Sequence, residues 1–251
     1  MIVFPNAKIN IGLNVVEKRP DGFHNIESIF YPVKELFDVL EIVEATVLKF
    51  TSSGIAIPGN HDDNLCLKAY RLIKTDFDVA SIHIHLHKVI PIGAGLGGGS
   101  ADAAFTLKAL NQLFELNLTE EQLIVYARKL GSDCAFFIKN TPVYAFGKGD
   151  EFEPIDLDLS KFNIKIEYPN IHVGTAEAYA GVKPKPSSKS LKDLIKLPIE
   201  NWKNSIKNDF EASIFLNHLQ IKVLKEKFYN EGAIYASMTG SGSAVFGIFE
   251  K

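Results

Sequence analysis

The residues best suited to chemistry form a glycine-rich segment at positions 91–101, which reads Pro-Ile-Gly-Ala-Gly-Leu-Gly-Gly-Gly-Ser-Ala. Five of the seven residues from 93 to 99 are glycine, and glycine lets a backbone turn sharply and approach a ligand closely. The segment follows a predicted strand and precedes a predicted helix, whose first N–H groups and dipole favour an anion. This pattern indicates a phosphate-binding loop. Ser100 could cap the helix, contact phosphate, or bind the metal that accompanies a nucleotide.

Three other interpretations of this segment are weaker. The spacing Gly93-x-Gly95-x-x-Gly98 matches the dinucleotide fingerprint. However, the acidic residue expected about 20 positions later falls at Glu115, at the end of a predicted helix and not after a strand. A Walker A loop needs a lysine after its glycines, and none is present. A merely structural turn would not need so many glycines, because each one carries an entropic cost.

Composition describes an ordinary globular chain around this loop. Of 251 residues, 46% are hydrophobic and 23% are charged, and the net charge of −3 provides no basic excess for nucleic acid. Cys66 and Cys134 are too few for a disulfide framework or a four-cysteine zinc site. No apolar run is long enough for a membrane span, and the first residues do not resemble a signal peptide. We expect a cytoplasmic protein that acts without nucleic acid or membrane.

Hydrophobic periodicity predicts the elements that position the loop. Alternation predicts strands over 8–16, 38–50 and 81–90, and helical spacing predicts helices over 101–114 and 119–130. The second helix opens with a capping box from Thr119 to Gln122. Further strands are predicted in 141–155, 163–169 and at the chain end, with helices over 209–219 and 221–232, and residues 182–191 resemble a linker. The interpretation is an α+β chain with lobes at 1–153 and 154–251.

Three histidines occur at two-residue spacing in the predicted strand over 81–90. Ile82, Ile84 and Leu86 would point to one side of that strand, and the histidines to the other. This spacing resembles a metal site, but the pattern offers no acidic or cysteine partner. We therefore interpret the histidines as a solvated strand face.

Further segments identify a family. The glycine loop resembles the ATP-phosphate loop of the galactokinase, homoserine kinase, mevalonate kinase and phosphomevalonate kinase (GHMP) family. Other segments similar to family motifs, in the family's order, are Ala7-Lys8-Ile9-Asn10, Asp21-Gly22-Phe23-His24, Asp63-Asn64-Leu65, Leu130-Gly131-Ser132-Asp133, Pro169 with Thr175-Ala176-Glu177-Ala178-Tyr179, Asn208-Asp209-Phe210-Glu211 and Thr239-Gly240-Ser241-Gly242-Ser243.

The resemblance implies a two-lobed GHMP kinase fold, with an N-terminal nucleotide-binding lobe, a C-terminal substrate-side lobe and the site in the cleft between them. It also implies ATP-dependent phosphorylation of the 2-hydroxyl of 4-diphosphocytidyl-2-C-methyl-D-erythritol, in the non-mevalonate route to isoprenoid precursors. Mg²⁺ is expected with ATP, but no metal ligand is indicated. The alternatives are another GHMP kinase of mevalonate or homoserine type, or a non-catalytic nucleotide-binding protein.

Two residues match the catalytic positions of the family. The resemblance implies that Asp133 accepts a proton from the attacking hydroxyl, although it could merely cap a following helix. Lys8 would keep that carboxylate ionised and polarise the hydroxyl or the γ-phosphate. The alternative for Lys8 is a strand-edge lysine with its amine in water.

The remaining site residues are also implied by the resemblance. Residues expected to contact ATP are Pro91, Ile92, Gly93, Ala94, Gly95, Leu96, Gly97, Gly98, Gly99, Ser100, Ala101 and Asn64, the last near the adenine. Residues expected to contact the substrate are Asn10, Phe23, His24, Lys148 and Thr175. The alternatives are a structural role for Asn10, a satisfied loop histidine for His24, turns for Asn64 and Lys148, and a helix cap for Thr175. Phe23 stands where the family usually has tyrosine, so its ring could stack on cytosine but offers no hydroxyl. The chain ends two residues after Phe249, where related kinases often continue, and this removes no recognised motif.

Overall fold

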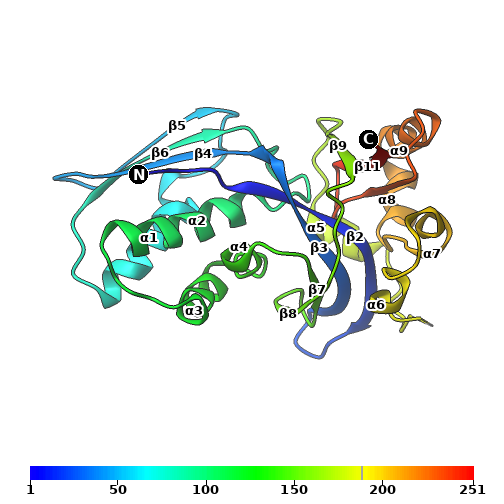
Figure 1. Ribbon diagram of the computed structural model, residues 1–251, viewed down its shortest axis with the longest axis horizontal. Coiled ribbons are helices and arrows are strands. Elements are labelled where there is room, and N and C mark those ends of the chain that lie inside the picture. Colours follow the sequence, from blue (N-terminus) through cyan, green and yellow to red (C-terminus); the bar gives the residue numbers. More distant parts are fainter. Residues whose placement is uncertain (188) are drawn as a thin grey trace. The chain divides into compact units, whose positions relative to one another are not determined.

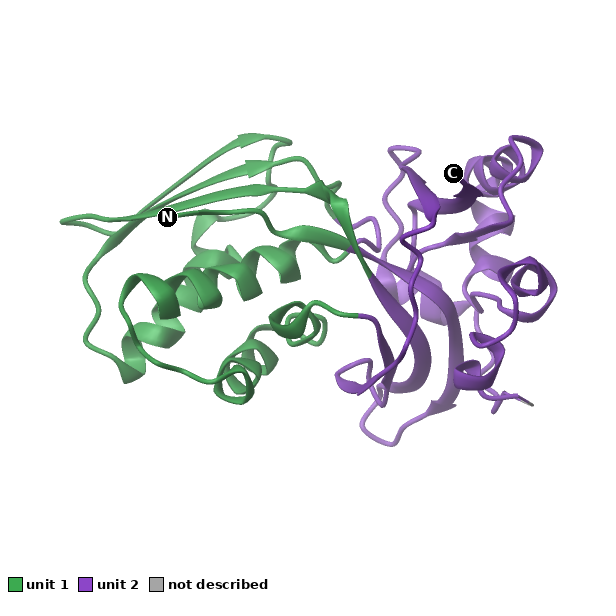
Figure 2. Cartoon of the chain, viewed as in Figure 1, with its two compact units in different colours: residues 1–7, 32–92, 97–141 green, residues 8–31, 93–96, 142–251 purple. Residues whose placement is uncertain are grey.

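The computed structural model describes residues 1–187 and 189–251 (Figure 1). The chain forms two compact units that are interleaved along the sequence, as Figure 2 shows. Unit 1 contains residues 1–7, 32–92 and 97–141, and unit 2 contains residues 8–31, 93–96 and 142–251. The lobes expected from the sequence, 1–153 and 154–251, divide the chain differently from these two units. That division into lobes stays a prediction. The expected linker over 182–191 lies in unit 2, and its residue 188 is outside the described residues.

Unit 1 is built on a four-stranded sheet. Its order is β1 (Ile2–Val3), β4 (Val39–Glu44), β6 (Ile82–Lys88) and β5 (Lys49–Gly54). Strand β6 is antiparallel to β4 and parallel to β5. The single strand predicted over 38–50 is therefore wrong, because the chain reverses to place β4 and β5 on opposite sides of β6. Alternation continues through both strands, so it could not reveal that reversal.

Four α-helices accompany this sheet in the described part of unit 1. They are α1 (Leu65–Asp76), α2 (Gly98–Leu113), α3 (Glu120–Leu130) and α4 (Phe136–Lys139), and a short 3-10 helix, η1 (His61–Asp63), precedes α1. Figure 1 shows α1 and α2 along one face of the sheet. The predicted capping box is confirmed, since the Thr119 hydroxyl accepts from the Gln122 N–H and the Gln122 side chain accepts from the Thr119 N–H.

The two faces of β6 differ as predicted. Ile82, Ile84 and Leu86 are buried, whereas the histidines between them lie on the other face. There the Thr51 hydroxyl contacts the rings of His83 and His85 at 3.0 and 2.9 Å. Histidines of β6 and hydroxyl groups of β5 therefore contact one another on this face.

Unit 2 holds two sheets. The first has the order β2 (Asn6–Lys18), β3 (His24–Phe37), β7 (Val143–Phe146) and β8 (Glu151–Pro154), with the first residues of β2 and the last of β3 belonging to unit 1. The second is antiparallel, with the order β10 (Tyr235–Met238), β11 (Val245–Glu250) and β9 (Phe162–Glu167). The strands predicted in 141–155, in 163–169 and at the chain end are confirmed.

Short helices complete unit 2. They are α5 (Thr175–Ala180), α6 (Leu191–Leu194), η2 (Ile199–Asn201), α7 (Trp202–Ser205), α8 (Glu211–Asn217) and α9 (Leu219–Asn230). The predicted helices over 209–219 and 221–232 correspond to α8 and α9. Phe210, Ile214 and Phe228 pack with Met238 and Val245 in one buried cluster. Burial of these apolar side chains joins the helices to β10 and β11.

Candidate active site

The amino end of α2 has the properties of an anion site. The first backbone hydrogen bond of this helix runs from the Ala101 N–H to the Gly97 carbonyl, at 2.9 Å. The N–H groups of Gly98, Gly99 and Ser100 precede it and have no partner within the helix. They lie at the positive end of the helix dipole. Gly99 is exposed, and a Cβ built on it would meet only Leu65 Cδ1, at 3.9 Å. A phosphate can therefore approach this backbone.

Ser100 does not cap this helix. The capping position is Gly97, and Ser100 is the third helical residue. Its side chain hydrogen-bonds the Cys134 sulfur, within unit 1. The helix-cap interpretation of Ser100 is wrong, and its contact with phosphate or metal stays a prediction.

A buried charge cluster lies beside the same helix end. Lys88 Nζ is 2.5 Å from Asp38 Oδ2 and 2.7 Å from Asp102 Oδ2, and all three side chains are buried. The other Asp38 oxygen accepts from the N–H groups of Val89 and Ile90. Burial raises the pKa of Asp102 to about 7, against the opposing effect of Lys88. The cluster joins the end of β6 to the first turns of α2, and it was missed in the sequence.

Residues 93–96 form the other half of the glycine loop and belong to unit 2. Their carbonyl groups accept hydrogen bonds within that unit. The Thr239 hydroxyl donates to the Gly95 carbonyl at 3.1 Å, and the Ala244 N–H donates to the Ala94 carbonyl at 3.1 Å. The Lys8 N–H donates to the Leu96 carbonyl at 2.9 Å. Residues 93–96 of the glycine loop and the turn that begins at Thr239 therefore lie together, beside the strand that carries Lys8.

Lys8 and Asn10 occupy neighbouring positions on the same side of β2. Lys8 is only 3% exposed, so the alternative of an amine in water is wrong. Lys8 Nζ donates to Asn10 Oδ1 at 2.5 Å and lies 4.6 Å from the centre of the Phe30 ring. Asn10 also donates to the Ser28 hydroxyl at 2.9 Å. The structure thus supports the structural role of Asn10, and its contact with substrate stays a prediction.

Asp133 lies in a turn of unit 1, before α4. The capping position of α4 is Ala135, so Asp133 does not cap that helix. Lys8 belongs to unit 2, so the pairing of Lys8 with Asp133 stays a prediction.

The side chains of Phe23 and Lys148 contact each other, although they come from segments of unit 2 that are far apart in the sequence. The Phe23 ring is 59% exposed, and Lys148 Nζ lies 5.2 Å from its centre. The Phe23 N–H donates to Asp21 Oδ1, and Lys148 Nζ is 3.8 Å from an oxygen of Asp150. An exposed aromatic ring beside an ammonium group suits the base and diphosphate of a nucleotide.

His24 is held by an aromatic residue that the sequence did not single out as a site residue. Its ring stacks on Tyr179, with centres 4.6 Å apart and an angle of 18°. Tyr179 lies on α5, in the same motif as Thr175, and meets Phe210 edge-on at 4.9 Å. Thr175 begins α5 after Gly174 takes the capping position, so the cap interpretation of Thr175 is wrong. The spacing from Thr175 to Tyr179 could have indicated one helix turn.

Asn64 has a defined local role. It is the capping residue of α1, and its side-chain oxygen accepts from the Cys66 N–H at 2.9 Å. This agrees with the turn interpretation. A contact with adenine stays a prediction.

Comparison with known proteins decides the family. The model for the GHMP kinases N terminal domain matches residues 64–141, and the model for the GHMP kinases C terminal domain matches residues 189–251. A 4-diphosphocytidyl-2-C-methyl-D-erythritol kinase of Azobacteroides pseudotrichonymphae is 52% identical over 100% of this chain and 94% of that protein. Another protein of that name, from Cytophaga hutchinsonii, is 54% identical over 99% of this chain and 92% of its own length. The chain belongs to the 4-diphosphocytidyl-2-C-methyl-D-erythritol kinase family.

The fold agrees with this family. A crystal structure of a 4-(cytidine 5'-diphospho)-2C-methyl-D-erythritol kinase superposes with a TM-score of 0.85 and 29% identity, over 99% of this chain and 90% of that one. The α+β GHMP kinase fold expected from the sequence is therefore confirmed. No helix of the described residues combines the length and the apolar character needed to cross a membrane.

A kinase of this family implies ATP, and Mg²⁺ is generally expected with it. Within residues 1–187 and 189–251, no three histidine, cysteine or acidic side chains are grouped so as to hold a metal ion. Mg²⁺ usually keeps several waters and is held through phosphates with one or two carboxylates. The backbone N–H groups at the start of α2 suit phosphates, and a magnesium ion bound to those phosphates would need few protein ligands.

Proposed function

We propose that this protein transfers the γ-phosphoryl group of ATP to the 2-hydroxyl of 4-diphosphocytidyl-2-C-methyl-D-erythritol, in the non-mevalonate route to isoprenoid precursors. The observation that carries the proposal is full-length identity of 52% and 54% to relatives that bear this kinase name. We further place the reaction in the cytoplasm, with a small-molecule substrate and without nucleic acid or membrane.

The glycine loop binds the ATP phosphates in this proposal. The N–H groups at the start of α2 offer donors and a positive dipole, and Gly99 leaves the approach open. Ser100 is the side chain of the loop that could reach phosphate or the accompanying Mg²⁺. Mg²⁺ supplies charge neutralisation of the phosphates when bound.

Asp133 and Lys8 act on the reacting hydroxyl. The proton of the 2-hydroxyl passes to the Asp133 carboxylate as the hydroxyl oxygen bonds to the γ-phosphorus. The bond from that phosphorus to the β,γ-bridging oxygen breaks, and ADP leaves with the electron pair. Lys8, buried and oriented by Asn10, stabilises negative charge on the transferring group. Positioning and charge stabilisation provide most of the catalysis, because the transferred phosphoryl group resembles metaphosphate.

The cytidylyl end of the substrate meets the aromatic residues of unit 2. Phe23 offers its exposed face for stacking on cytosine, and His24 can bond the pyrimidine edge. Lys148, which already lies over the Phe23 ring, contacts the diphosphate. Thr175 and Asn10 complete the substrate contacts in this proposal, and Asn64 contacts the adenine of ATP.

The experiment is an assay of ADP release with ATP, Mg²⁺ and the cytidylyl substrate, with mevalonate and homoserine as alternative acceptors. We expect turnover only with the cytidylyl substrate. Asp133→Asn should lower kcat by about 10²–10⁴-fold, the usual contribution of a general base. Asp158→Asn is the matched control, since Asp158 is exposed, accepts hydrogen bonds from Ser160 in a turn and is not a proposed site residue. Turnover of mevalonate or homoserine instead would overturn the proposed substrate, and an active Asp133→Asn would overturn the proposed base.

A further inference from the structure

The segment from Asn208 to Glu211 matched the family in sequence but received no role. Asn208 is 2% exposed, and its side chain uses all of its principal hydrogen-bonding groups. The amide nitrogen donates to the carbonyls of Met238 and Gly240, at 2.9 and 2.8 Å. The amide oxygen accepts from the Phe210 N–H at 3.0 Å. Asn208 thus binds the carbonyl groups on both sides of Thr239.

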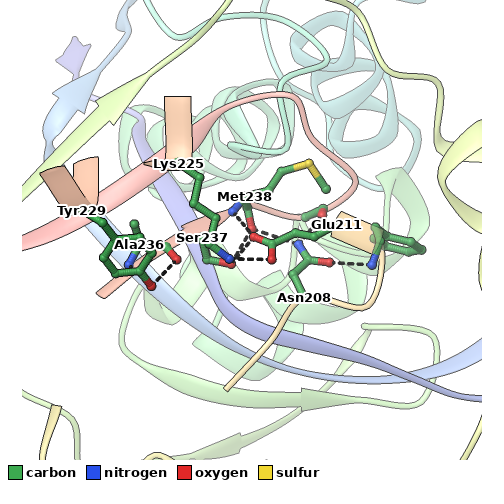
Figure 3. Close-up of polar contacts among 9 residues, drawn as sticks. Asn208, Glu211, Lys225, Tyr229, Ala236, Ser237 and Met238 are labelled. Atoms are coloured by element: carbon green, nitrogen blue, oxygen red, sulfur yellow. Dashed lines mark hydrogen bonds and ion pairs between the residues drawn. The ribbon is translucent and has the colours of Figure 1, made fainter. Parts of the chain in front are cut away.

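Glu211 holds the same backbone from the other direction. One carboxylate oxygen accepts from the Met238 N–H at 2.9 Å and from the Ser237 hydroxyl at 3.1 Å. The other lies 2.6 Å from the ammonium of Lys225, on α9. Figure 3 shows both side chains directed at Met238. The residue before Thr239 is therefore fixed at its N–H group and at its carbonyl.

The 208–211 segment is itself tied to β2, the strand that carries Lys8. Leu13 N–H donates to the Lys207 carbonyl at 2.9 Å, and Asp209 N–H donates back to the Leu13 carbonyl at 2.8 Å. The Asp209 carboxylate accepts from the Val15 N–H at 2.8 Å. These contacts fix the position of Asn208 along the strand.

Thr239 connects this fixed backbone to residues of the proposed active site. Its hydroxyl accepts from the Asn10 N–H at 3.0 Å and donates to the Gly95 carbonyl. Asn10 in turn accepts from Lys8 Nζ at 2.5 Å. The contacts run without interruption from Asn208 through the turn at Thr239 to Asn10 and Lys8. Every residue in this path belongs to unit 2.

We propose that Asn208 is a positioning residue for catalysis: its amide clamps the backbone on both sides of Thr239, and Thr239 then sets Asn10, Lys8 and the glycine loop at Gly95. Glu211 supports the clamp through Met238. The inference rests on the proposed function only in taking Lys8 as a catalytic residue. It predicts that loss of the clamp moves Lys8 without removing any group that touches a ligand.

Asn208→Asp tests the clamp with little change of shape. The aspartate replaces the donating nitrogen by an oxygen, which would face two carbonyl oxygens that also only accept. Displacement of a catalytic group by about 1 Å can cost 10²-fold in rate. We therefore expect kcat to fall by about 10–100-fold, with smaller rises in KM for ATP and for the cytidylyl substrate, because Gly95 and Asn10 also contact Thr239.

Asn111→Asp is the matched control. Asn111 also holds a loop through both side-chain groups, at the N–H and carbonyl of Leu118, and that loop contains no proposed site residue. The Asn111→Asp variant should be less stable than wild type, but its kcat should not fall. A comparable fall in kcat in both variants would overturn the inference, because it would show a general effect of lost stability.

Hydrogen exchange distinguishes failure of the inference from failure of the proposed function. Asn208→Asp should speed amide exchange in 237–244 and in 8–12, even if wild-type protein does not phosphorylate the cytidylyl substrate. Asn111→Asp should leave both regions protected. If Asn208→Asp exchanges faster in 237–244 but leaves 8–12 and kcat unchanged, the clamp does not reach Lys8 and the inference is wrong.

Discussion

Gly95 and Thr239 are packed backbone against backbone. A Cβ on Gly95 would lie 2.1 Å from the Thr239 carbonyl oxygen, and Gly95 has φ of +79°. Both the close approach and the left-handed conformation require glycine at this position. This contact joins two glycine-rich turns that are far apart in the sequence.

Gly95→Ala should therefore destabilise the protein by about 2–3 kcal/mol, from strain in a left-handed backbone and from the clash with Thr239. Urea denaturation followed by circular dichroism measures this loss. Gly99→Ala is the control, because its Cβ would meet only Leu65 at 3.9 Å, and Gly99 lies inside α2. That variant should be neutral or more stable by less than about 1 kcal/mol. Equal losses in the two variants would contradict the packing argument.

The sequence predicted those structural elements well that depend on a single local pattern. The glycine loop, the capping box at Thr119 and the terminal hairpin each depend on neighbours in the chain, and the structure contains the expected elements. Helix α1 was missed although Cys66, Ala69, Tyr70 and Ile73 have helical spacing and are buried. That signal was present and could have been used.

Other features could not be predicted from local pattern. The stacking of His24 on Tyr179 joins residues that are far apart in the chain, as does the contact of Gly95 with Thr239. Helical or strand periodicity describes one element at a time, so it indicates which residues are buried but not which distant residues meet. The Lys88 cluster was missed for the same reason: alternation puts Lys88 on the buried side of β6, but it does not indicate that Asp38 and Asp102 meet it there.

Asp102 should make stability depend on pH. Burial raises its pKa to about 7 in the folded protein, whereas an unfolded aspartate has a pKa near 3.9. Between about pH 4 and 7 the folded state binds more protons at this group than the unfolded state. Its contribution to the free energy of unfolding therefore falls as pH rises, by at most about 1.4 kcal/mol per pH unit.

Asp102→Asn removes this titration while keeping the shape of the side chain. Denaturation of both proteins at pH 5, 6, 7 and 8 gives the difference in free energy of unfolding at each pH. We expect wild type to lose stability relative to the variant from pH 5 to 7 and the difference to level off above that. A difference that does not change with pH would show that Asp102 is ionised throughout.

The two thiols should be unreactive in the folded protein. Burial raises the pKa of Cys134 to about 11 and also raises the pKa of Cys66, so neither forms the reactive thiolate near neutral pH. Ellman's reagent at pH 8 should modify no thiol until denaturant is added, and then two. Leu216→Cys provides the positive control, because residue 216 is 86% exposed and its thiol should react at once. Rapid reaction of wild type in buffer would contradict the burial of these residues.

The stacking of His24 on Tyr179 should affect substrate binding specifically. Aromatic pairs contribute about 0.5–1.5 kcal/mol beyond the area they bury, and 1.4 kcal/mol corresponds to tenfold in affinity. Tyr179→Leu removes the ring that holds His24, so KM for the cytidylyl substrate should rise by about 3–10-fold. Tyr179→Phe keeps the ring and should show a smaller rise.

The KM for ATP is the internal reference for this prediction. His24 and Tyr179 both belong to unit 2, and neither is part of the glycine loop. If Tyr179→Leu raised both KM values equally, the ring would support the protein generally and not the substrate side. If His24→Ala raised KM for the cytidylyl substrate while Tyr179→Leu did not, His24 would hold its position without the stack. A rise confined to the cytidylyl substrate in both variants, with no further rise when they are combined, would show that Tyr179 acts through His24.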